Sequence, residues 1–190
     1  MPVPNPAQLG PLAALVGTWE GAAGLDVSFH NAENAVGETP YRERITFNPF
    51  GPVDNGAQHL FGLDYRMAAW RNDEPDPFHT EVGYWLWCSD SQQVMRCFMV
   101  PRGTVAIAGG TAAPDAKSFT MTAELGSLTY GVLENKYLAE HASTTKYECT
   151  ITVTGADSWS YDETTTLKMA KLGGEEMAHT DRNAMHRVAG

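Results

Sequence analysis

The stretch Thr145–Leu167, TKYECTITVTGADSWSYDETTTL, decides the fold because its residue types alternate along both halves. In the first half, every second residue from Tyr147 to Val153 is apolar or aromatic, and threonine or glutamate fills the positions between them. In the second half, Trp159 and Tyr161 continue the pattern after the turn signal Gly155-Ala156-Asp157. Successive side chains of a strand point to opposite faces, so this stretch predicts an antiparallel hairpin with one buried face.

Strands of the same kind recur along most of the chain. Asp54-Asn55-Gly56 and Ser89-Asp90-Ser91 are turn signals, and we expect Asn48–Pro52 to break a strand. Besides the hairpin, the expected strands are Tyr41–Phe47, His59–Trp70, Val82–Cys88, Val94–Val100, Thr104–Ile107, Ser118–Leu125, Thr129–Leu133 and Tyr137–Ser143. About ten strands without interleaved helices favour an all-β fold, an antiparallel up-and-down barrel or a sandwich. We expect the barrel, as a single domain over residues 1–190.

The N-terminal segment has the one helical pattern that we find. Asn5 is a good capping residue, and Pro6 suits a first helical turn. Leu9, Leu12 and Leu15 then fall on one face of a short helix. We expect this helix to close one end of the barrel and residues 1–8 to be a flexible tail.

The composition excludes several functions. A net charge of -10 argues against non-specific binding to nucleic acid or to an anionic membrane surface, since both need clustered lysine and arginine. We find no apolar run long enough for insertion into a bilayer and no signal-peptide pattern at the N-terminus. Cys88, Cys97 and Cys149 are odd in number and lack a CxxC spacing, which indicates reduced thiols. We therefore expect a cytoplasmic protein.

A barrel of this size either fills its interior with side chains or holds one small ligand. The run Tyr84-Trp85-Leu86-Trp87 places large side chains on both faces of one strand. This favours an outer face covered by the N-terminal helix or by a second subunit, and so a homodimer is one expectation. His179 follows the long period-two strand near the C-terminus, where an imidazole at the barrel mouth would suit an iron cofactor. An ordinary polar connection into a last strand is the other interpretation of the residues around it.

Several stretches resemble the nitrobindins, a family of haem-binding β-barrels shaped like fatty-acid-binding proteins. Gly17-Thr18-Trp19-Glu20-Gly21 is similar to the family's glycine-tryptophan-glycine signature, and Tyr41-Arg42-Glu43 with Ile45 to its next strand. The most specific match is Pro77–Tyr84, PFHTEVGY, which resembles a proline-x-histidine-x-glutamate-x-glycine-aromatic strand. Thr164-Thr165-Thr166 and His179 resemble the threonine-rich strand and the axial histidine.

The chain also departs from the family pattern in its loops. Ala23 stands where the signature has a third glycine, and the tyrosine-proline-threonine that usually follows has no counterpart. We expect Leu25–Thr39 to form a longer loop that contains His30, and Ala170–Ala178 is also longer than usual. These loops would flank the ligand.

The resemblance implies a small-molecule ligand, haem b, with iron bound by His179 and isomerisation of peroxynitrite to nitrate at that haem. It implies cofactor contacts by Gly17, Trp19 and Gly21 of the signature, and His30 is a candidate for the opposite side of the ligand. Thr180, Asp181 or a backbone carbonyl would hold the second ring nitrogen of His179.

Two alternatives to haem stay open from the residues. The barrel would carry an apolar carboxylate such as a fatty acid if an arginine lies inside it. It would bind nothing if its interior is filled. His79 and Glu81 lie on one face of a strand, and we expect them to form a buried hydrogen-bonded pair.

Overall fold

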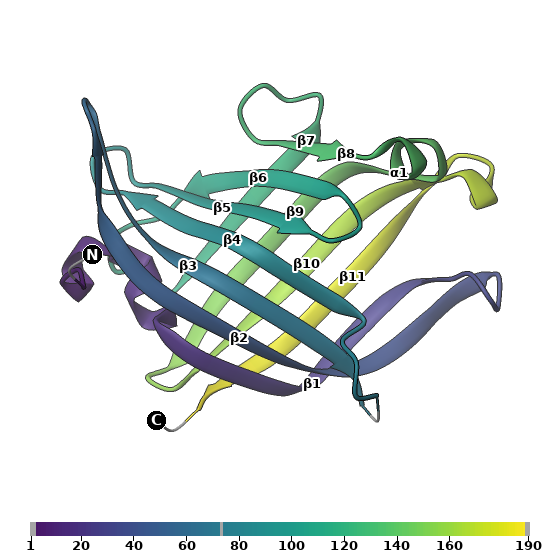
Figure 1. Ribbon diagram of the computed structural model, residues 1–190, viewed down its shortest axis with the longest axis horizontal. Helices are drawn as coiled ribbons and strands as arrows, with labels where there is room; N and C mark the ends of the chain where they lie inside the picture. Colours follow the sequence, from purple (N-terminus) through teal and green to yellow (C-terminus); the bar gives the residue numbers. More distant parts are fainter. Residues whose placement is uncertain (1–2, 73, 189–190) are drawn as a thin grey trace.

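The computed structural model describes residues 3–72 and 74–188, and in this part of the chain eleven strands close into one barrel (Figure 1). Neighbours around the barrel follow the order β1-β11-β10-β9-β7-β8-β6-β5-β4-β3-β2. The strands are β1 (Gly17–His30), β2 (Ala35–Asn55), β3 (Gln58–Arg71), β4 (His79–Cys88), β5 (Gln93–Val100), β6 (Thr104–Thr111), β7 (Ser118–Leu125), β8 (Gly131–Glu134), β9 (Ala142–Gly155), β10 (Ser158–Met169) and β11 (Glu175–Arg187). The helices are η1 (Pro6–Gln8), η2 (Gly10–Leu15), α1 (Lys136–His141) and η3 (Ala170–Leu172).

The predicted all-β barrel is confirmed, with one difference in strand direction. The short strand β8 runs parallel to β7, with Glu124 opposite Gly131 and Leu125 opposite Val132. The chain makes a full loop between these strands, so β8 continues in the direction of β7 (Figure 1). The barrel is therefore mixed rather than purely antiparallel.

The β9–β10 hairpin is confirmed with its predicted turn and alternation. Tyr147, Cys149 and Ile151 of β9 and Trp159 of β10 are buried, and the register pairs Tyr161 with Ile151. The inward residues of β2 from Tyr41 to Phe47 follow the same rule. Period-two alternation is thus a reliable guide wherever one face of a strand packs on the core.

Three local predictions are wrong. Asn48–Pro52 does not break the strand, because β2 runs through it and a register shift between Phe50 and Val53 absorbs the irregular residues. Leu25–Thr39 is no long loop, because β1 and β2 stay paired up to His30 and Ala35. Tyr137–Ser143 contains α1 instead of a strand, because the side chain of Asn135 accepts a hydrogen bond from the Leu138 amide at 3.0 Å and caps the helix.

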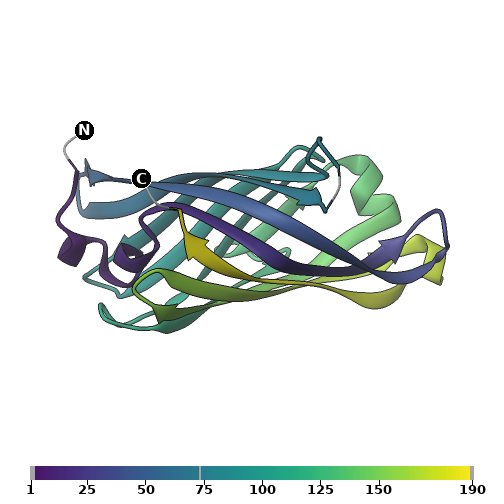
Figure 2. The ribbon, with the colours of Figure 1, turned by 90° about the horizontal axis from the view of Figure 1, so that it is seen from below.

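The N-terminal helices cover the end of the barrel at which β1 begins (Figures 1 and 2). The side chain of Asn5 caps η1, as expected, although η1 and η2 are short 3-10 helices. Pro6–Gln8 form η1, although the sequence suggested a tail there, and Met1 and Pro2 lie outside the described residues. Leu12 and Leu15 of η2 are fully buried and plug this closed end.

An aromatic core fills the closed end behind these helices. The Trp19 Nε1 donates to the carbonyl of Leu15 at 2.7 Å, and its ring meets Trp159 edge to face with centroids 6.1 Å apart. Phe47 packs on Trp85 and Trp159 at centroid distances of 5.5 and 6.1 Å. This core leaves the other end of the barrel to hold a cavity.

None of the helices in the described residues combines the length and apolar character needed to cross a membrane.

Replacing Trp19 tests whether the signature tryptophan serves the fold. We expect Trp19→Ala to lower the free energy of unfolding by about 3–5 kcal/mol, because it leaves a cavity in a packed core and removes the tie to η2. Trp70→Ala is the control, since Trp70 lies half-buried on the outer face of β3, and we expect a loss of about 1 kcal/mol. Equal losses in urea denaturation would contradict this role.

Candidate functional site

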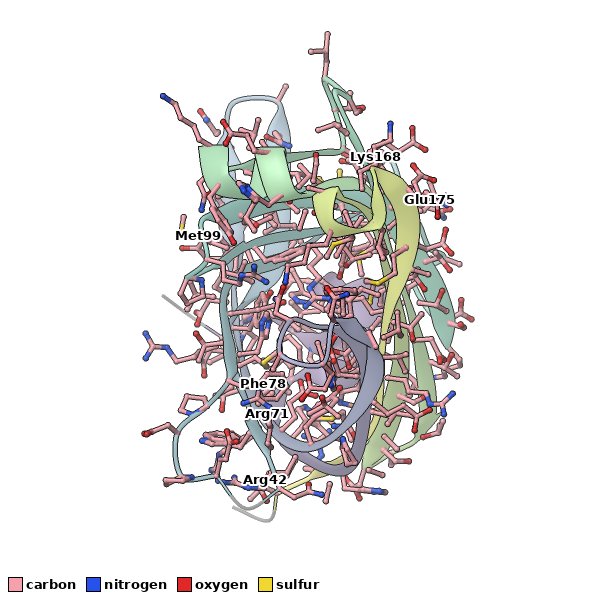
Figure 3. All side chains as sticks on the ribbon, turned by 90° about the vertical axis from the view of Figure 1, so that its right-hand side faces the viewer. Arg42, Arg71, Phe78, Met99, Lys168 and Glu175 are labelled. Carbon is pink, nitrogen blue, oxygen red and sulfur yellow. The ribbon has the colours of Figure 1, made fainter. Side chains whose placement is uncertain are left out.

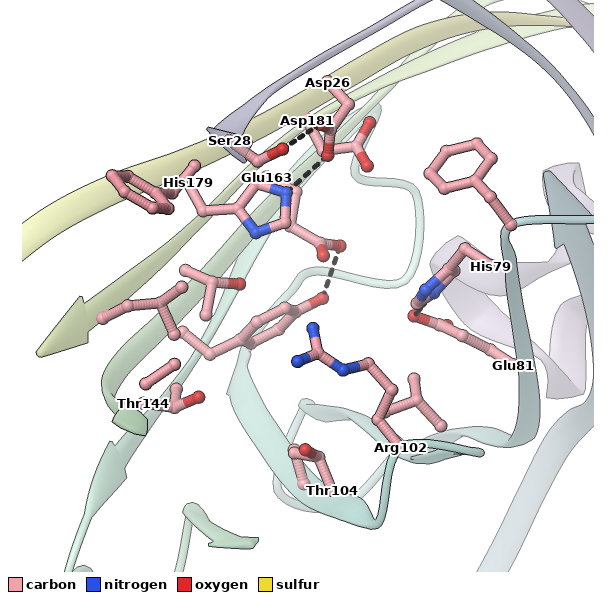
Figure 4. A pocket seen from close by; sticks show the side chains of 18 of the residues that line it. Asp26, Ser28, His79, Glu81, Arg102, Thr104, Thr144, Glu163, His179 and Asp181 are labelled. Atoms are coloured by element: carbon pink, nitrogen blue, oxygen red, sulfur yellow. Dashed lines mark hydrogen bonds and ion pairs between the residues drawn. The ribbon is translucent and has the colours of Figure 1, made fainter. Parts of the chain in front are cut away.

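A cavity of about 720 Å³ opens at the end of the barrel opposite the N-terminal helices. Its rim comes from the β1–β2 hairpin, the β5–β6 turn, α1 and η3, and its walls are inward-facing side chains of the strands (Figure 4). This cavity contradicts the alternative of a filled interior. A volume of this size is typical of sites for small organic ligands.

His179 projects into this cavity from β11 (Figure 4). It lies in the last strand opposite Thr165 of β10, so it is no part of a connecting loop. Its Nε2 is 2.5 Å from Oδ2 of Asp26, and the Ser28 hydroxyl donates to Oδ1 of Asp26 at 2.5 Å. Asp26 is opposite Asp181 in the β1–β11 ladder, and this register places its carboxylate beside the imidazole.

Asp26 and His179 shift each other's titration in opposite directions. Burial alone would raise the pKa of Asp26 and lower the pKa of His179. The hydrogen bond and the attraction between the two groups outweigh burial, so the pKa of Asp26 is lowered and that of His179 is raised. The pair thus favours an ionised Asp26 next to a protonated His179. A metal ion that binds a ring nitrogen of His179 would have to replace a proton there.

Deeper in the barrel lies a second group, the Arg96 belt, which we define as Arg96, Glu81, Glu163, Tyr65 and Tyr147. Nη2 of Arg96 donates to Glu81 at 2.5 Å and Nη1 to Glu163 at 2.7 Å. The Tyr65 hydroxyl also donates to Glu81, and the Tyr147 hydroxyl donates to Glu163, each at 2.7 Å. Burial opposes ionisation of Glu81, but Arg96 and the hydrogen bonds lower its pKa to about 2.

His79 and Glu81 form the predicted pair, with Nε2 of His79 3.2 Å from the glutamate. Glu81 is fully buried, while a third of the His79 side chain remains accessible from the cavity. The prediction of a hydrogen-bonded pair is confirmed, and the partner that the sequence did not reveal is Arg96.

A third group, the tyrosine chain, connects two carboxyl groups through Tyr41 and Tyr161. Tyr41 donates to Asp181, its hydroxyl lies 2.7 Å from that of Tyr161, and Tyr161 donates to Glu43 at 2.7 Å. Asn183 also donates to Glu43 at 3.2 Å. Burial, with the like charge of nearby carboxylates, raises the pKa of both Glu43 and Asp181 to about 7.

The other predicted site residues divide between the two ends of the barrel. His30 lines the cavity at its rim, where its Nε2 lies 3.1 Å from the Thr39 hydroxyl. Gly17, Trp19 and Gly21 lie toward the closed end on β1 and are not among the described residues that line the cavity. A Cβ on Gly21 would lie 2.6 Å from the side chains of Asn183 and Met185, so close packing requires glycine there. Contacts of these three residues with a ligand stay a prediction.

The partner of His179 differs from the candidates that the sequence suggested. Asp26 holds the ring of His179. Asp181 instead accepts a hydrogen bond from Tyr41, and the side chain of Thr180 lies on the other face of β11. Asp26 was missed because it was assigned to a loop. Arg96 was missed too, although it shares the inward parity of Val94 and Phe98, and an arginine at such a position is a detectable signal of a buried ion pair.

Comparison with known proteins identifies the family of this barrel. Two curated proteins called peroxynitrite isomerase, from Clavibacter sepedonicus and Clavibacter michiganensis subsp. michiganensis, are each 37% identical over 91 residues, 45% of this chain. The aligned part spans only 38% of the length of those relatives. The crystal structure of Rv2717c from M. tuberculosis superposes with a TM-score of 0.66 over 99% of this chain and all of that one, at 17% identity, which supports the fold.

The family model described as "THAP4-like, heme-binding beta-barrel domain" matches residues 8–187, nearly the whole chain. The matched region includes β1 to β11 and every residue of the cavity wall discussed above. The chain therefore belongs to the THAP4-like haem-binding β-barrel family.

Proposed function

We propose that this protein binds haem b at the open end of its barrel, with His179 as the axial ligand of the iron. One observation carries the proposal: a histidine inside the cavity of a haem-binding family has one ring nitrogen held by a carboxylate. Histidines that bind metals commonly donate their other N–H to a carboxylate, which fixes the tautomer and the orientation of the ring. Asp26 performs this role at Nε2 and leaves Nδ1 as the nitrogen for iron.

The surroundings of His179 fit a flat, mostly apolar cofactor. Phe29, Val100, Leu167, Met169 and Met177 line the cavity together with His179. These side chains form apolar walls near the rim, while the Arg96 belt lies deeper. A porphyrin could therefore pack against the apolar walls without disrupting the ion pairs of the Arg96 belt. Ser28 keeps the Asp26 carboxylate in place by donating to its second oxygen.

We further propose peroxynitrite isomerisation as the activity, in line with the names of the two Clavibacter relatives. Haem held by a single imidazole keeps one axial position of its iron open for a small oxidant. The chain itself contributes orientation of His179 through Asp26 and control of the local charge. Asp181, with its pKa raised to about 7, is partly protonated near neutral pH, which limits repulsion of an anionic oxidant.

A carrier of an apolar carboxylate is the second candidate function. A carboxylate ligand would need an unpaired cation inside the barrel. Arg96 is already bound by Glu81 and Glu163 at 2.5 and 2.7 Å, so a fatty acid that used it would have to displace one of these glutamates. Arg71 and Arg102 also line the cavity, and Figure 4 shows Arg102 among the side chains of the pocket, so cations other than Arg96 are available to a carboxylate. A cytoplasmic location remains our expectation, and it agrees with the free thiols of Cys88, Cys97 and Cys149.

Haem binding by His179 is tested by adding hemin to the purified protein. We expect a Soret band that His179→Ala abolishes, because the variant loses the ligand of the iron. His141→Ala is the matched control, since His141 also lines the cavity but is exposed at the end of α1, and it should keep the band. Full haem binding by a folded His179→Ala protein would rule out the assignment. Colourless wild-type protein that carries extracted lipid would favour the carrier instead.

The role of Asp26 has a pH signature. Iron competes with a proton for His179, so haem affinity falls as the pH is lowered through the pKa of this histidine. Because that pKa is raised, we expect the affinity of the wild type to begin to fall near the upper end of a titration from about pH 9 down to about pH 5. We expect Asp26→Asn to weaken binding about 10–100-fold and to move this decline to lower pH, because the carboxylate that stabilises the imidazolium is gone. Asp162→Asn, on the outer face of β10, is the control for hemin titrations across this range. An unchanged midpoint in Asp26→Asn would contradict the coupling.

Isomerisation requires a separate measurement. We expect haem-loaded protein to accelerate the decay of peroxynitrite in stopped-flow absorbance and to yield nitrate, while haem-free protein and His179→Ala leave the decay at its spontaneous rate. Haem-loaded protein without acceleration would refute the activity and leave haem binding untouched.

A further inference from the structure

We infer that Tyr161 is a redox-active tyrosine, which gives one electron to a radical oxidant in the cavity while its proton passes to Glu43. Tyr161 lines the cavity and is partly exposed, and Glu43 is buried. The hydroxyl of Tyr161 donates to Oε2 of Glu43 at 2.7 Å. A phenol that loses an electron must also release its proton, and a carboxylate within hydrogen-bond distance is placed to receive it.

Access to the cavity together with a carboxylate acceptor distinguishes Tyr161 from the other tyrosines, since all seven lie in the described residues. Three others donate to carboxylates but are between 1% and 4% exposed, namely Tyr41, Tyr65 and Tyr147. Tyr84 and Tyr137 are 52% and 63% exposed, and neither hydroxyl donates to a described residue. Tyr130 receives a hydrogen bond from Gln93. Tyr161 therefore combines a route for an oxidant with an acceptor for the proton.

The position of Arg96 makes two other cavity tyrosines poorer electron donors than Tyr161. The Arg96 guanidinium lies 5.9 Å from the ring centroid of Tyr65 and 5.8 Å from that of Tyr147. A cation attracts the electron-rich face of a neutral ring and opposes the removal of an electron from it. In the described part of the chain no cation lies over the ring of Tyr161, and the carboxyl groups of the tyrosine chain are close to it instead.

The hydroxyl of Tyr161 keeps its proton until an electron leaves. Burial, together with the charges of Glu43 and Asp181, raises the pKa of Tyr161 well above its usual range. Loss of the electron is therefore coupled to transfer of the proton to Glu43. The hydroxyl of Tyr41, 2.7 Å from that of Tyr161, remains as a hydrogen-bonding partner for the oxidised tyrosine.

Trp159 connects Tyr161 to the aromatic core of the closed end. Its ring centroid lies 6.0 Å from that of Tyr161 and 6.1 Å from that of Trp19. The Arg187 guanidinium lies over Trp19 at 4.1 Å, so a positive charge is less stable on Trp19 than on Trp159. An electron vacancy formed on either tryptophan would therefore be filled from Tyr161.

A further arginine at the rim is also kept off the tyrosine chain. Arg71 is opposite Tyr41 in the β2–β3 register, yet its guanidinium lies over the ring of Phe78 at 4.9 Å. Phe78 in turn meets the ring of Tyr41 edge to face with centroids 6.0 Å apart. Figure 3, which looks into the open end of the barrel, shows Arg71 and Phe78 together. The aromatic ring thus stands between this cation and the tyrosine chain.

Nitrogen dioxide is an oxidant of the class that suits this site, because it is a small uncharged radical that the acidic interior does not repel. One molecule takes an electron from Tyr161 and becomes nitrite, while the O–H bond breaks and the proton binds Glu43. A second molecule then forms a C–N bond with the ring carbon next to the oxygen-bearing carbon. The hydrogen of that ring carbon moves to the oxygen, and the product is 3-nitrotyrosine.

Site-resolved nitration of the haem-free protein tests this inference. Nitrogen dioxide is generated by irradiation of nitrite under nitrous oxide at about pH 8, where Glu43, with its pKa of about 7, is mostly ionised. We expect mass spectrometry to find the largest nitrated fraction at Tyr161, although Tyr84 and Tyr137 are more exposed. Glu43→Gln should lower the ratio of nitration at Tyr161 to that at Tyr137 at least about tenfold, because an amide does not accept the proton. Glu148→Gln, on the outer face of β9, is the matched control and should leave the ratio unchanged.

Each result decides the matter once circular dichroism shows that the variants are folded. Nitration that follows exposure, with Tyr137 and Tyr84 ahead of Tyr161, overturns the inference, and so does an unchanged ratio in Glu43→Gln. If Glu43→Gln does not fold, the ranking of tyrosines in the wild type decides alone. The reaction contains neither haem nor peroxynitrite, so its failure would leave the proposed haem site and activity untouched.

Discussion

The buried guanidinium of Arg96 is the constraint on which the inside of this barrel depends. It bonds Glu81 of β4 and Glu163 of β10, two strands that are not neighbours in the sheet, and so ties opposite sides of the barrel through the interior. Removing charges from water costs several kcal/mol per ion, and only close geometry with further hydrogen bonds offsets this. Tyr65 and Tyr147 supply those bonds. Loss of one partner would leave the others charged and buried, at a cost of about 3–5 kcal/mol.

The interior carboxyl groups are of two kinds. Glu81 and Asp26 have cationic partners, and their pKa values are lowered. Glu43 and Asp181 have tyrosine partners, and burial raises the pKa of each to about 7. The first kind stabilises the fold above the ordinary pKa of a carboxyl, an effect that for Glu81 is lost as the pH falls toward about 2. The second kind binds protons in the folded state that the unfolded chain has released. Its contribution to stability is therefore lost as the pH rises from about 4 to about 7.

Sequence reasoning found what depends on local pattern and missed what depends on pairing between distant strands. The alternation around Tyr147 and Trp159 predicted the barrel because one face of each strand must be buried. His179 was found through its likeness to a family, and the structure places it in the cavity. Asp26 could not be assigned as its partner, because the residues are 153 positions apart and meet only through the β1–β11 register. The helix at Tyr137 was missed because its cap, Asn135, lay outside the strand pattern.

The acidic interior places opposite demands on His179. Neighbouring carboxylates favour its protonated form, which cannot bind a metal, while a ligand of the ring must find the neutral form. Asp26 contributes to both, since it stabilises the imidazolium and, in the proposed haem complex, would accept the N–H of the neutral ring. The raised pKa of Asp181 weakens the preference of His179 for its protonated form. A neutral carboxyl two residues from His179 stabilises the imidazolium less than a carboxylate would. Burial keeps the pKa of Asp181 raised although the Tyr41 hydroxyl favours the carboxylate, and so makes the neutral imidazole more accessible than a fully ionised cavity would allow.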